Sequence, residues 1–378
     1  MTSLRDRLRE EPLPGEAEAA ARSWTVVEAA LAERPPTPRR SRMPLRLAIV
    51  AGLLCLGLVT ALSPAGAWIE DRFEAEQRPP RPAFAALPKI GPVLAISRTG
   101  AYAVRPLGIR GLGPFSDAGW SPRGLHVVGV DGRRVTAVTP GGIVKWSLTR
   151  RAQVHHPAWS TGLGFAVAYL EGRALRVVDG RGDPKTDRRV RRSAAPVTPA
   201  WRPRSDSVLS YVTAGAAVET VNVDSRATVW RTAPNTLERP LALTWSSDGR
   251  QLVALSARSV TVLDAAGRVV RTLPLPGVAR ELALHPSGRH AAVLVRGRGG
   301  GRALDVPLDG ARQKQLFQGD LEGMSWSRNG RWLLLGWRGA DQWLLLGPGN
   351  RIRALHGVTR EIGARGGFPR VAGWCCAG

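Results

Sequence analysis

The sequence predicts an all-β protein built from a repeated unit of about 40 residues. Gly and Pro together make up 43 + 29 = 72 of the 378 residues, which indicates many tight turns because no Gly-X-Y period accompanies them. After residue 90, short β-branched runs alternate with Gly, Asp, Asn and Pro, and no sustained helical period occurs. A motif centred on tryptophan recurs through the same region and sets the length of the unit.

This motif returns six times between residues 119 and 331. It reads GWSPRG (119–124), AWSTGLG (158–164), AWRPRSD (200–206), TWSSDGR (244–250), ALHPSGR (283–289) and SWSRNGR (325–331). The anchor residues are Trp120, Trp159, Trp201, Trp245, Leu284 and Trp326, separated by 39, 42, 44, 39 and 42 residues. A period of about 40–45 residues is typical of the four-stranded blade of a β-propeller. We therefore predict a β-propeller over residues 93–378.

Each unit contains the strands and turns that such a blade requires. After TWSSDGR come the runs QLVALSA, SVTVLDA and RVVRTLP, which residues 258 and 266–267 separate. Ser and Asp accept local backbone hydrogen bonds and Gly provides positive φ, so the motif predicts a tight turn. We expect the tryptophan before this turn to fill the space between neighbouring blades.

The end of the chain predicts how the ring closes. Residues 373–378 read GWCCAG, so Trp374 aligns with Trp245 as a seventh anchor at the end of an inner strand. Residues 93–108 align with residues 260–274, and they are expected to supply the missing outer strands. Pairing of the first and last strands would remove two exposed sheet edges. We predict seven blades, with six as the alternative, and the second strand of the shared blade is left unassigned.

The residues before the propeller predict a membrane anchor. Residues 47–67 contain no charged side chain and just reach the length of a transmembrane helix. Arginines precede this span and acidic residues follow it, so we expect residues 1–46 in the cytoplasm and the propeller outside. Residues 68–92 form a Pro-rich linker. The alternative is a secreted protein, because Ala65-Gly66-Ala67 has the form of a signal peptidase site and would allow cleavage near Ala67.

Residues 1–46 are expected to contain short amphipathic helices and a Pro/Arg-rich linker. Trp24, Val27 and Leu31 fall on one helical stripe. They are candidates for docking a cytoplasmic partner. The alternative is a disordered tail with nascent helix, because isolated short helices are marginally stable in water.

Residues 93–378 resemble the bacterial TolB-like or WD40-like propellers, whose blades carry a W-S-P-D-G-x turn. The Gly-His and Trp-Asp pairs of eukaryotic WD repeats do not recur in this sequence. Two blades also resemble quinoprotein-type repeats, at Trp146 and Trp230, but Arg271 lies near the equivalent place in another blade. This departure does not support a quinone site. The resemblance implies an extracytoplasmic or scaffold role in binding, often of proteins.

The charge is strongly positive, with 54 Lys+Arg against 30 Asp+Glu and a formal net charge of +24. The arginines are dispersed rather than gathered in one stripe, so nucleic acid is not the expected partner. One basic cluster stands out, formed by Lys185, Arg188, Arg189, Arg191 and Arg192. It is a candidate patch for an anionic envelope component or a protein, and the alternative is an edge strand charged against aggregation. Alternation along a strand would place Arg189 and Arg191 on one face and Arg188 and Arg192 on the other.

The sequence contains no His-Glu-x-x-His, Cys-x-x-Cys, G-x-S-x-G or Walker spacing. We therefore expect no catalytic residues, no metal site and no cofactor. The favoured interpretation is a single-pass membrane protein whose propeller acts as a non-catalytic binding or scaffold module at the cell envelope. Two alternatives stay open. One is a transmembrane signalling regulator with a propeller sensor and a cytoplasmic docking helix, and the other is an extracytoplasmic hydrolase or lyase.

Overall fold

The computed structural model describes residues 83–88, 91–163, 165–297, 300–362 and 367–375. The expected span at 47–67 and the docking residues Trp24, Val27 and Leu31 lie outside these ranges. Within them, no helix has both the length and the apolar composition needed to cross a membrane.

Five four-stranded antiparallel sheets follow one another along the chain. The first contains β4 (Asp117–Trp120), β5 (Val127–Asp131), β6 (Arg134–Val138) and β7 (Val144–Thr149), and the second β8 (Val154–Trp159), β9 (Ala166–Glu171), β10 (Ala174–Asp179) and β11 (Arg188–Arg191). The third contains β12 (Ala200–Trp201), β13 (Val208–Val212), β14 (Val218–Asn222) and β15 (Thr228–Arg231). The fourth contains β16 (Pro240–Trp245), β17 (Gln251–Ser256), β18 (Ser259–Asp264) and β19 (Val269–Pro274), and the fifth β20 (Val278–Leu284), β21 (His290–Gly297), β22 (Gly300–Pro307) and β23 (Lys314–Gly319).

The remaining strands form one eight-stranded sheet in the order β27-β26-β25-β24-β28-β1-β2-β3. Its members are β24 (Leu321–Trp326), β25 (Leu333–Trp337), β26 (Gln342–Leu346), β27 (Ile352–His356), β28 (Arg370–Trp374), β1 (Val93–Ser97), β2 (Gly100–Arg105) and β3 (Gly108–Gly113). A single parallel bridge, Gly323↔Val371, joins β24 to β28. On one side of this bridge lies the antiparallel four-stranded unit β24–β27, and on the other side lies the antiparallel four-stranded unit β28/β1–β3.

Strands from the two ends of the described chain meet in the last of these units. β1 pairs antiparallel with β28, with Val93 opposite Trp374. β1 therefore takes the second place in its unit and β3 the outermost place. Our alignment of residues 93–108 with the third and fourth strands was wrong by one strand. It missed β3 because this outer strand, GIRGLG, lacks a β-branched run and is largely exposed.

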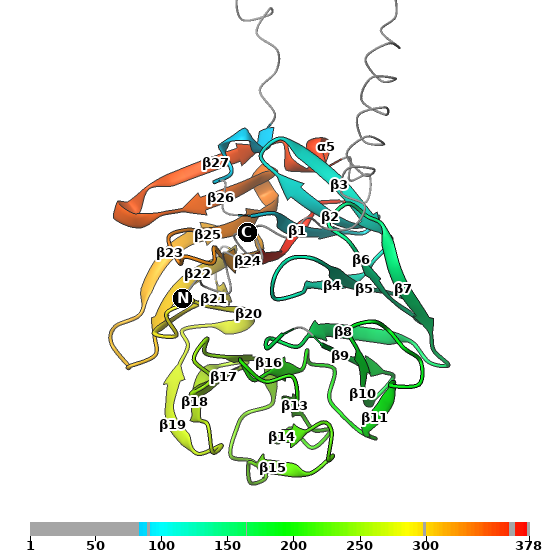
Figure 1. Ribbon diagram of the computed structural model, residues 1–378. Helices are drawn as coiled ribbons and strands as arrows, with labels where there is room; N and C mark the ends of the chain where they lie inside the picture. The colour runs from blue at the N-terminus through cyan, green and yellow to red at the C-terminus, as the bar shows by residue number, and fades with distance from the viewer. Residues whose placement is uncertain (1–82, 89–90, 164, 298–299, 363–366, 376–378) are drawn as a thin grey trace, which may run out of the picture. The chain divides into compact units, whose positions relative to one another are not determined.

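The sheets stand around a common centre, with the first strand of each unit innermost (Figure 1). The second and third strands are buried along most of their length, as in β17 and β18, whereas the outermost β19 is mostly exposed. Both faces of the middle strands are covered by neighbouring units, so their sequences are continuous apolar runs rather than alternating ones.

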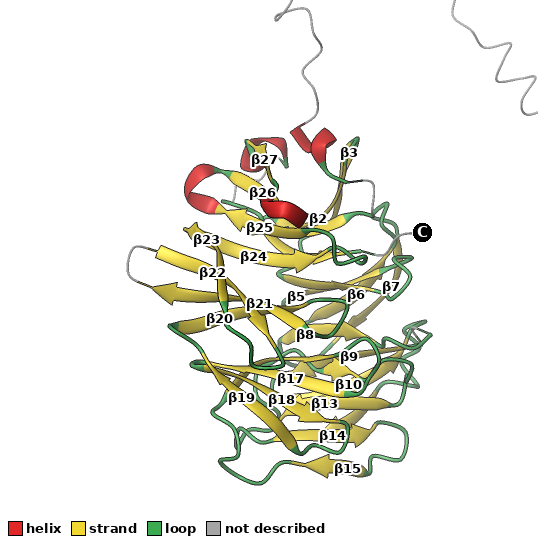
Figure 2. Cartoon of the chain, turned by 90° about the vertical axis from the view of Figure 1, so that its left-hand side faces the viewer, coloured by secondary structure: helices red, strands yellow, loops and turns green. Residues whose placement is uncertain are grey.

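The hydrophobic core is divided among the contacts between units. In one cluster, Ala168 and Val177 of unit β8–β11 pack with Trp201 and Leu209 of unit β12–β15. Short helical segments gather beside units β24–β27 and β28/β1–β3 (Figure 2). They are η1 (Ala83–Ala86), η2 (Arg338–Ala340), η3 (Pro348–Asn350) and α5 (Val358–Glu361). Phe84 of η1 lies 5.3 Å from the ring of Trp343, which places this segment against the outside of the ring of sheets.

Candidate functional site

The seven anchor residues end the innermost strands of the seven four-stranded units. Trp120 ends β4, Trp159 β8, Trp201 β12, Trp245 β16, Leu284 β20, Trp326 β24 and Trp374 β28. Several indoles tie one unit to another part of the fold. Trp201 Nε1 donates to the Ala158 carbonyl at 3.0 Å, and Trp326 Nε1 donates to the Ala283 carbonyl at 3.1 Å. The anchors therefore pack the ring together and present no reactive group.

Trp146 and Trp230 join neighbouring units at their outer edge. Trp146 Nε1 donates to the Gly180 carbonyl at 2.9 Å, and Trp230 Nε1 donates to the Ala265 carbonyl at 3.0 Å. Each ring covers a glycine in the next unit. A Cβ built on Gly182 would lie 2.3 Å from the Trp146 ring. Side chains at this position are therefore part of the scaffold.

The basic cluster is divided by the structure. Lys185, Arg189 and Arg192 are exposed. Arg188 instead donates to the Asp224 carboxylate and the Val223 carbonyl, and Arg191 donates to Glu219 at 2.8 Å. Both arginines thus reach unit β12–β15, although alternation was expected to separate them. The physical reason is a β-bulge, since Leu175 pairs with Arg191 and Arg176 with Arg189, which leaves one extra residue between them.

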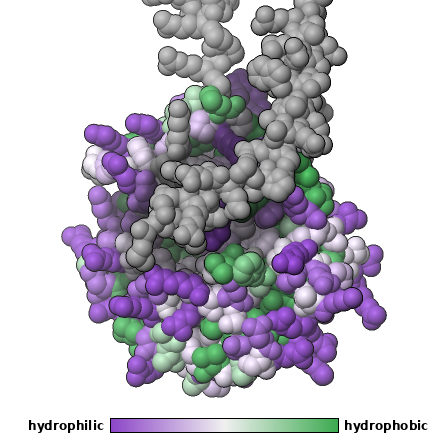
Figure 3. Space-filling view, viewed as in Figure 1, coloured by the Kyte–Doolittle hydropathy of each residue, from purple (hydrophilic) through white to green (hydrophobic). Residues whose placement is uncertain are grey.

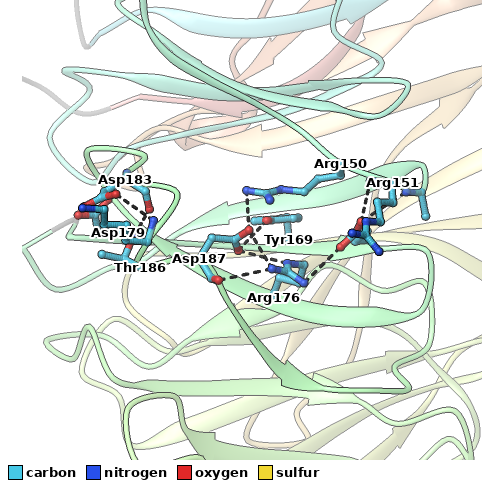
Figure 4. A network of polar contacts seen from close by, with 11 residues as sticks. Arg150, Arg151, Tyr169, Arg176, Asp179, Asp183, Thr186 and Asp187 are labelled. Carbon is cyan, nitrogen blue, oxygen red and sulfur yellow. Dashed lines mark hydrogen bonds and ion pairs between the residues drawn. The ribbon is translucent and has the colours of Figure 1, made fainter.

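Asp187 is the centre of a buried polar network between units β4–β7 and β8–β11 (Figure 4). Its side chain is 1% exposed and pairs with Arg150 and Arg176, and it accepts the Tyr169 hydroxyl at 2.8 Å. Burial, followed by the nearby Asp187 carboxylate, raises the pKa of Tyr169. The phenol therefore stays protonated at neutral pH and acts as a hydrogen-bond donor.

Glu219 is the centre of a similar polar network in unit β12–β15. Its carboxylate accepts hydrogen bonds from Arg191, Thr228 and Tyr211. Burial tends to raise the pKa of Glu219, but these three hydrogen bonds together outweigh it and the pKa is lowered. In both units a tyrosine of the second strand donates to a buried carboxylate. This carboxylate also pairs with an arginine of the preceding unit, Arg150 for Asp187 and Arg191 for Glu219. These networks therefore hold neighbouring units together.

A second polar group lies on the innermost strands and, for Thr198, just before β12. We name Asp117, His156, Thr198, Glu281 and Arg370 the inner-strand cluster. His156 Nδ1 lies 3.5 Å from the Asp117 carboxylate and 3.3 Å from the Thr198 hydroxyl. Arg370 reaches the other oxygen of Asp117 at 3.7 Å. Glu281 accepts the Gly323 backbone N–H at 3.2 Å, and burial raises its pKa against the attraction of Arg370.

The inner-strand cluster could have been found in the sequence, although we did not identify it. Asp117, His156, Thr198 and Glu281 each stand three residues before an anchor. In β8 a bulge between His155 and Ala158 and a φ of 56° at His156 change the direction of the strand at this position. The repeat therefore places polar side chains on the inner edge of several units.

Three grooves lie between neighbouring units, beside the turns that follow the anchors. The first, of about 570 Å³, lies between units β4–β7 and β8–β11. The second, of about 560 Å³, lies between β16–β19 and β20–β23, and the third, of about 530 Å³, between β20–β23 and β24–β27. The first differs from the others because three large apolar side chains in its lining, Leu125, Leu163 and Phe165, are exposed, whereas the second has one, Val270.

The third groove brings two histidines and an aspartate together. His290 lies 3.3 Å from the Asp305 carboxylate, and the ring of His285 packs edge-on against Trp326 with 4.7 Å between centroids. Within the described residues, no group of three His, Cys, Asp or Glu side chains is arranged to hold a metal ion.

Comparison with known proteins identifies the class of fold. No family model and no curated protein matches this sequence. The structure is similar to the Cps50 (Swd1) β-propeller domain of Myceliophteria thermophila, with a TM-score of 0.53 and 16% identity over 64% of this chain and 87% of that domain. It is also similar to hydrazine synthase of Kuenenia stuttgartiensis, with a TM-score of 0.49 and 19% identity over 62% of this chain and 76% of that one. The chain therefore contains an all-β propeller domain of repeated units, as the sequence predicted. At these identities the likeness concerns the fold alone.

Proposed function

We propose that this protein is a β-propeller of seven blades that binds another macromolecule without catalysing a reaction. The observation that carries the proposal is the first groove, where three large apolar side chains are exposed together on the ring of sheets. Contiguous exposed apolar surface is typical of interaction sites, because isolated apolar side chains are common on any surface but groups of them are not. Seven blades are supported by seven four-stranded units, each with its own anchor.

The proposed location is the outer side of a cell membrane. The uncharged stretch at 47–67, with arginines before it and acidic residues after it, supports a single-pass anchor. The partner is then a protein or an anionic component of the cell envelope. N-terminal sequencing of the mature chain tests the anchor. A chain that begins at Trp68 would show that the apolar stretch is cleaved and that the protein is secreted.

Affinity purification of the full chain tests the binding role. We expect a specific partner to be recovered equally well by the full chain and by a variant that lacks residues 1–46. Loss of the partner in that variant, or in Trp24→Ala, would favour a regulator that docks through its cytoplasmic tail. Turnover of a hydrolase or oxidoreductase substrate that Asp117→Asn or His156→Ala abolishes would contradict the non-catalytic assignment.

A further inference from the structure

The first groove combines an aromatic floor with an exposed apolar rim. His126 stacks on the buried Trp159 with 6.0 Å between ring centroids. Leu125, Leu163 and Phe165 stand around this floor with exposed fractions of 61%, 59% and 64%. Figure 3 shows apolar side chains gathered near the middle of the face of the propeller. Covering Leu125, Leu163 and Phe165 on binding would contribute favourable free energy in proportion to the apolar area removed from water.

The two other grooves share the position of the first but not its group of exposed large apolar side chains. In the second groove one such side chain, Val270, is exposed beside Arg271, Arg289 and Asp309. The apolar side chains that line the third, among them Leu316, Trp326 and Leu333, are buried or partly buried. A group of three exposed apolar side chains is therefore not required by the fold at this position.

Hydrogen bonds hold Thr161, Leu163 and His126, in the loops of the first groove, in place. The Leu163 backbone N–H donates to Asp206 at 2.9 Å, and the Thr161 hydroxyl donates to the Trp201 carbonyl at 3.3 Å. In the facing loop, the His126 backbone N–H donates to the Ser121 hydroxyl at 3.0 Å. A preformed site loses less conformational entropy on binding.

The charges around the first groove are mainly positive. Arg123 and Arg181 line it, both are exposed, and neither has an ion-pair partner among the described residues. Lys145 lies close enough to act on His126, whose pKa is lowered by burial and then by this ammonium. The carboxylate of Asp179 accepts the Asp183 backbone N–H at 2.9 Å. The cations therefore remain available to carboxylates of a partner.

We propose that the first groove binds an extended segment of a partner protein that carries large apolar side chains flanked by Asp and Glu. The apolar side chains would cover Leu125, Leu163 and Phe165, and the carboxylates would face Arg123, Lys145 and Arg181. A nucleic acid or a phosphate would use the cations but leave the apolar rim exposed. The proposal rests on the proposed binding function and names the chemistry of its partner.

Fluorescence polarisation with the full chain tests the proposal. The probes are fluorescein-labelled nonapeptides in which one Leu and one Phe, separated by zero to three residues, lie in an Asp/Glu background. We expect saturable binding that weakens as salt screens the exposed charges. Phe165→Asp and Arg181→Glu are expected to weaken it at least about tenfold, as removal of a central contact does at other interfaces. Matched controls are Ile352→Asp and Arg312→Glu, which make the same changes at exposed positions outside the first groove.

Several results would overturn the proposal. They include equal binding by Phe165→Asp, equal binding of peptides with Ser in place of Leu and Phe, and binding of anionic vesicles but of no peptide. Tighter peptide binding after neutralisation of Glu70, Asp71, Glu74 and Glu76 would assign the groove to the chain's own segment instead. Self-association that Phe165→Asp abolishes would assign it to a second copy. A partner recovered equally by the wild type and by Phe165→Asp would reject this groove while leaving the binding function intact.

Discussion

Arg191 and Glu219 show how single residues join neighbouring units. The arginine ends β11 in one unit, and its guanidinium donates to Glu219 at 2.8 and 3.0 Å and to the Thr228 hydroxyl at 3.0 Å in the next unit. The Glu219 side chain is 7% exposed. A buried carboxylate of this kind is costly once its cation is removed.

We expect Arg191→Ala to lower the free energy of unfolding by about 2 kcal/mol, less than for a fully buried pair because the guanidinium itself is partly exposed. Arg192→Ala is the matched control, since Arg192 is exposed and is the next residue in the chain. Urea unfolding of both variants measures the difference. Equal stability of the two would show that the pair contributes nothing.

Glu281 allows a test by pH. Its carboxylate accepts the Gly323 N–H and lies near the charges of Arg370, Glu322 and Arg280. Burial raises the pKa of Glu281 in the folded chain. A raised carboxyl pKa means that the folded state holds the proton more tightly, so stability falls as the pH rises above the unfolded value of about 4.3. We expect Glu281→Gln, which keeps an acceptor for Gly323, to lose less Tm than the wild type between pH 4 and pH 7.

The control for this pH series is Asp131→Asn, which changes an exposed carboxylate. Its Tm should follow that of the wild type across the same range. A Glu281→Gln curve parallel to both would contradict the burial of a charged carboxylate at this position.

At the scale of elements, the turns of one unit fit against the outer strand of the preceding unit. Gly182 follows β10 with a φ of 72°, and the ring of Trp146 on β7 covers it. Gly267 follows β18 in the same way beneath Trp230. These turns require glycine both for the backbone conformation and for the close approach of an indole.

Gly182→Ala separates these two requirements when it is compared with Gly132→Ala. Both glycines have positive φ, but a Cβ on Gly132 would meet nothing within 4 Å. Gly132→Ala should therefore cost about 1 kcal/mol for its backbone alone. We expect Gly182→Ala to cost at least about 1 kcal/mol more because the indole must move. Thermal unfolding of the two variants measures the difference, and equal costs would show that the indole adjusts freely.

At the scale of the whole molecule, the ring depends on the pairing of β1 with β28. Trp374 on β28 is buried, and its indole donates to the Gly91 carbonyl at 3.2 Å. The Cys375 N–H donates to the Pro92 carbonyl at 2.9 Å. Without β28, the edges of β1 and β24 would be left unpaired, and exposed edges promote association.

Deletion of residues 370–378 is therefore expected to lower Tm and to cause self-association, measured by thermal unfolding and size-exclusion chromatography. Truncation after Cys375 keeps β28 and should behave like the wild type. A monomeric chain of unchanged Tm after the longer deletion would show that β28 is not needed for closure.

The repeat, the strands and the turn chemistry were predictable because they depend on short-range patterns. The separations of Trp120 to Trp326 and the residues after each anchor could be read directly from the chain. The outermost β3 was missed because an exposed Gly-rich strand carries no apolar signal. The exposure of Leu125, Leu163 and Phe165 could not be predicted, because burial depends on which loops of neighbouring units cover a side chain.

The amino-acid sequence by itself therefore determined a repeated all-β fold, its period and the place of each anchor, since a strand, a tight turn and a buried indole are local requirements. Only the tertiary structure decided which charges are paired and which surfaces are open. It joined Arg188 and Arg191 to the next unit through a bulge, brought the inner-strand cluster together from segments far apart in the chain, and left Leu125, Leu163 and Phe165 exposed in one groove. These features depend on contacts between residues 28 to about 250 positions apart, and distances in space of this kind are set by packing and not by sequence spacing.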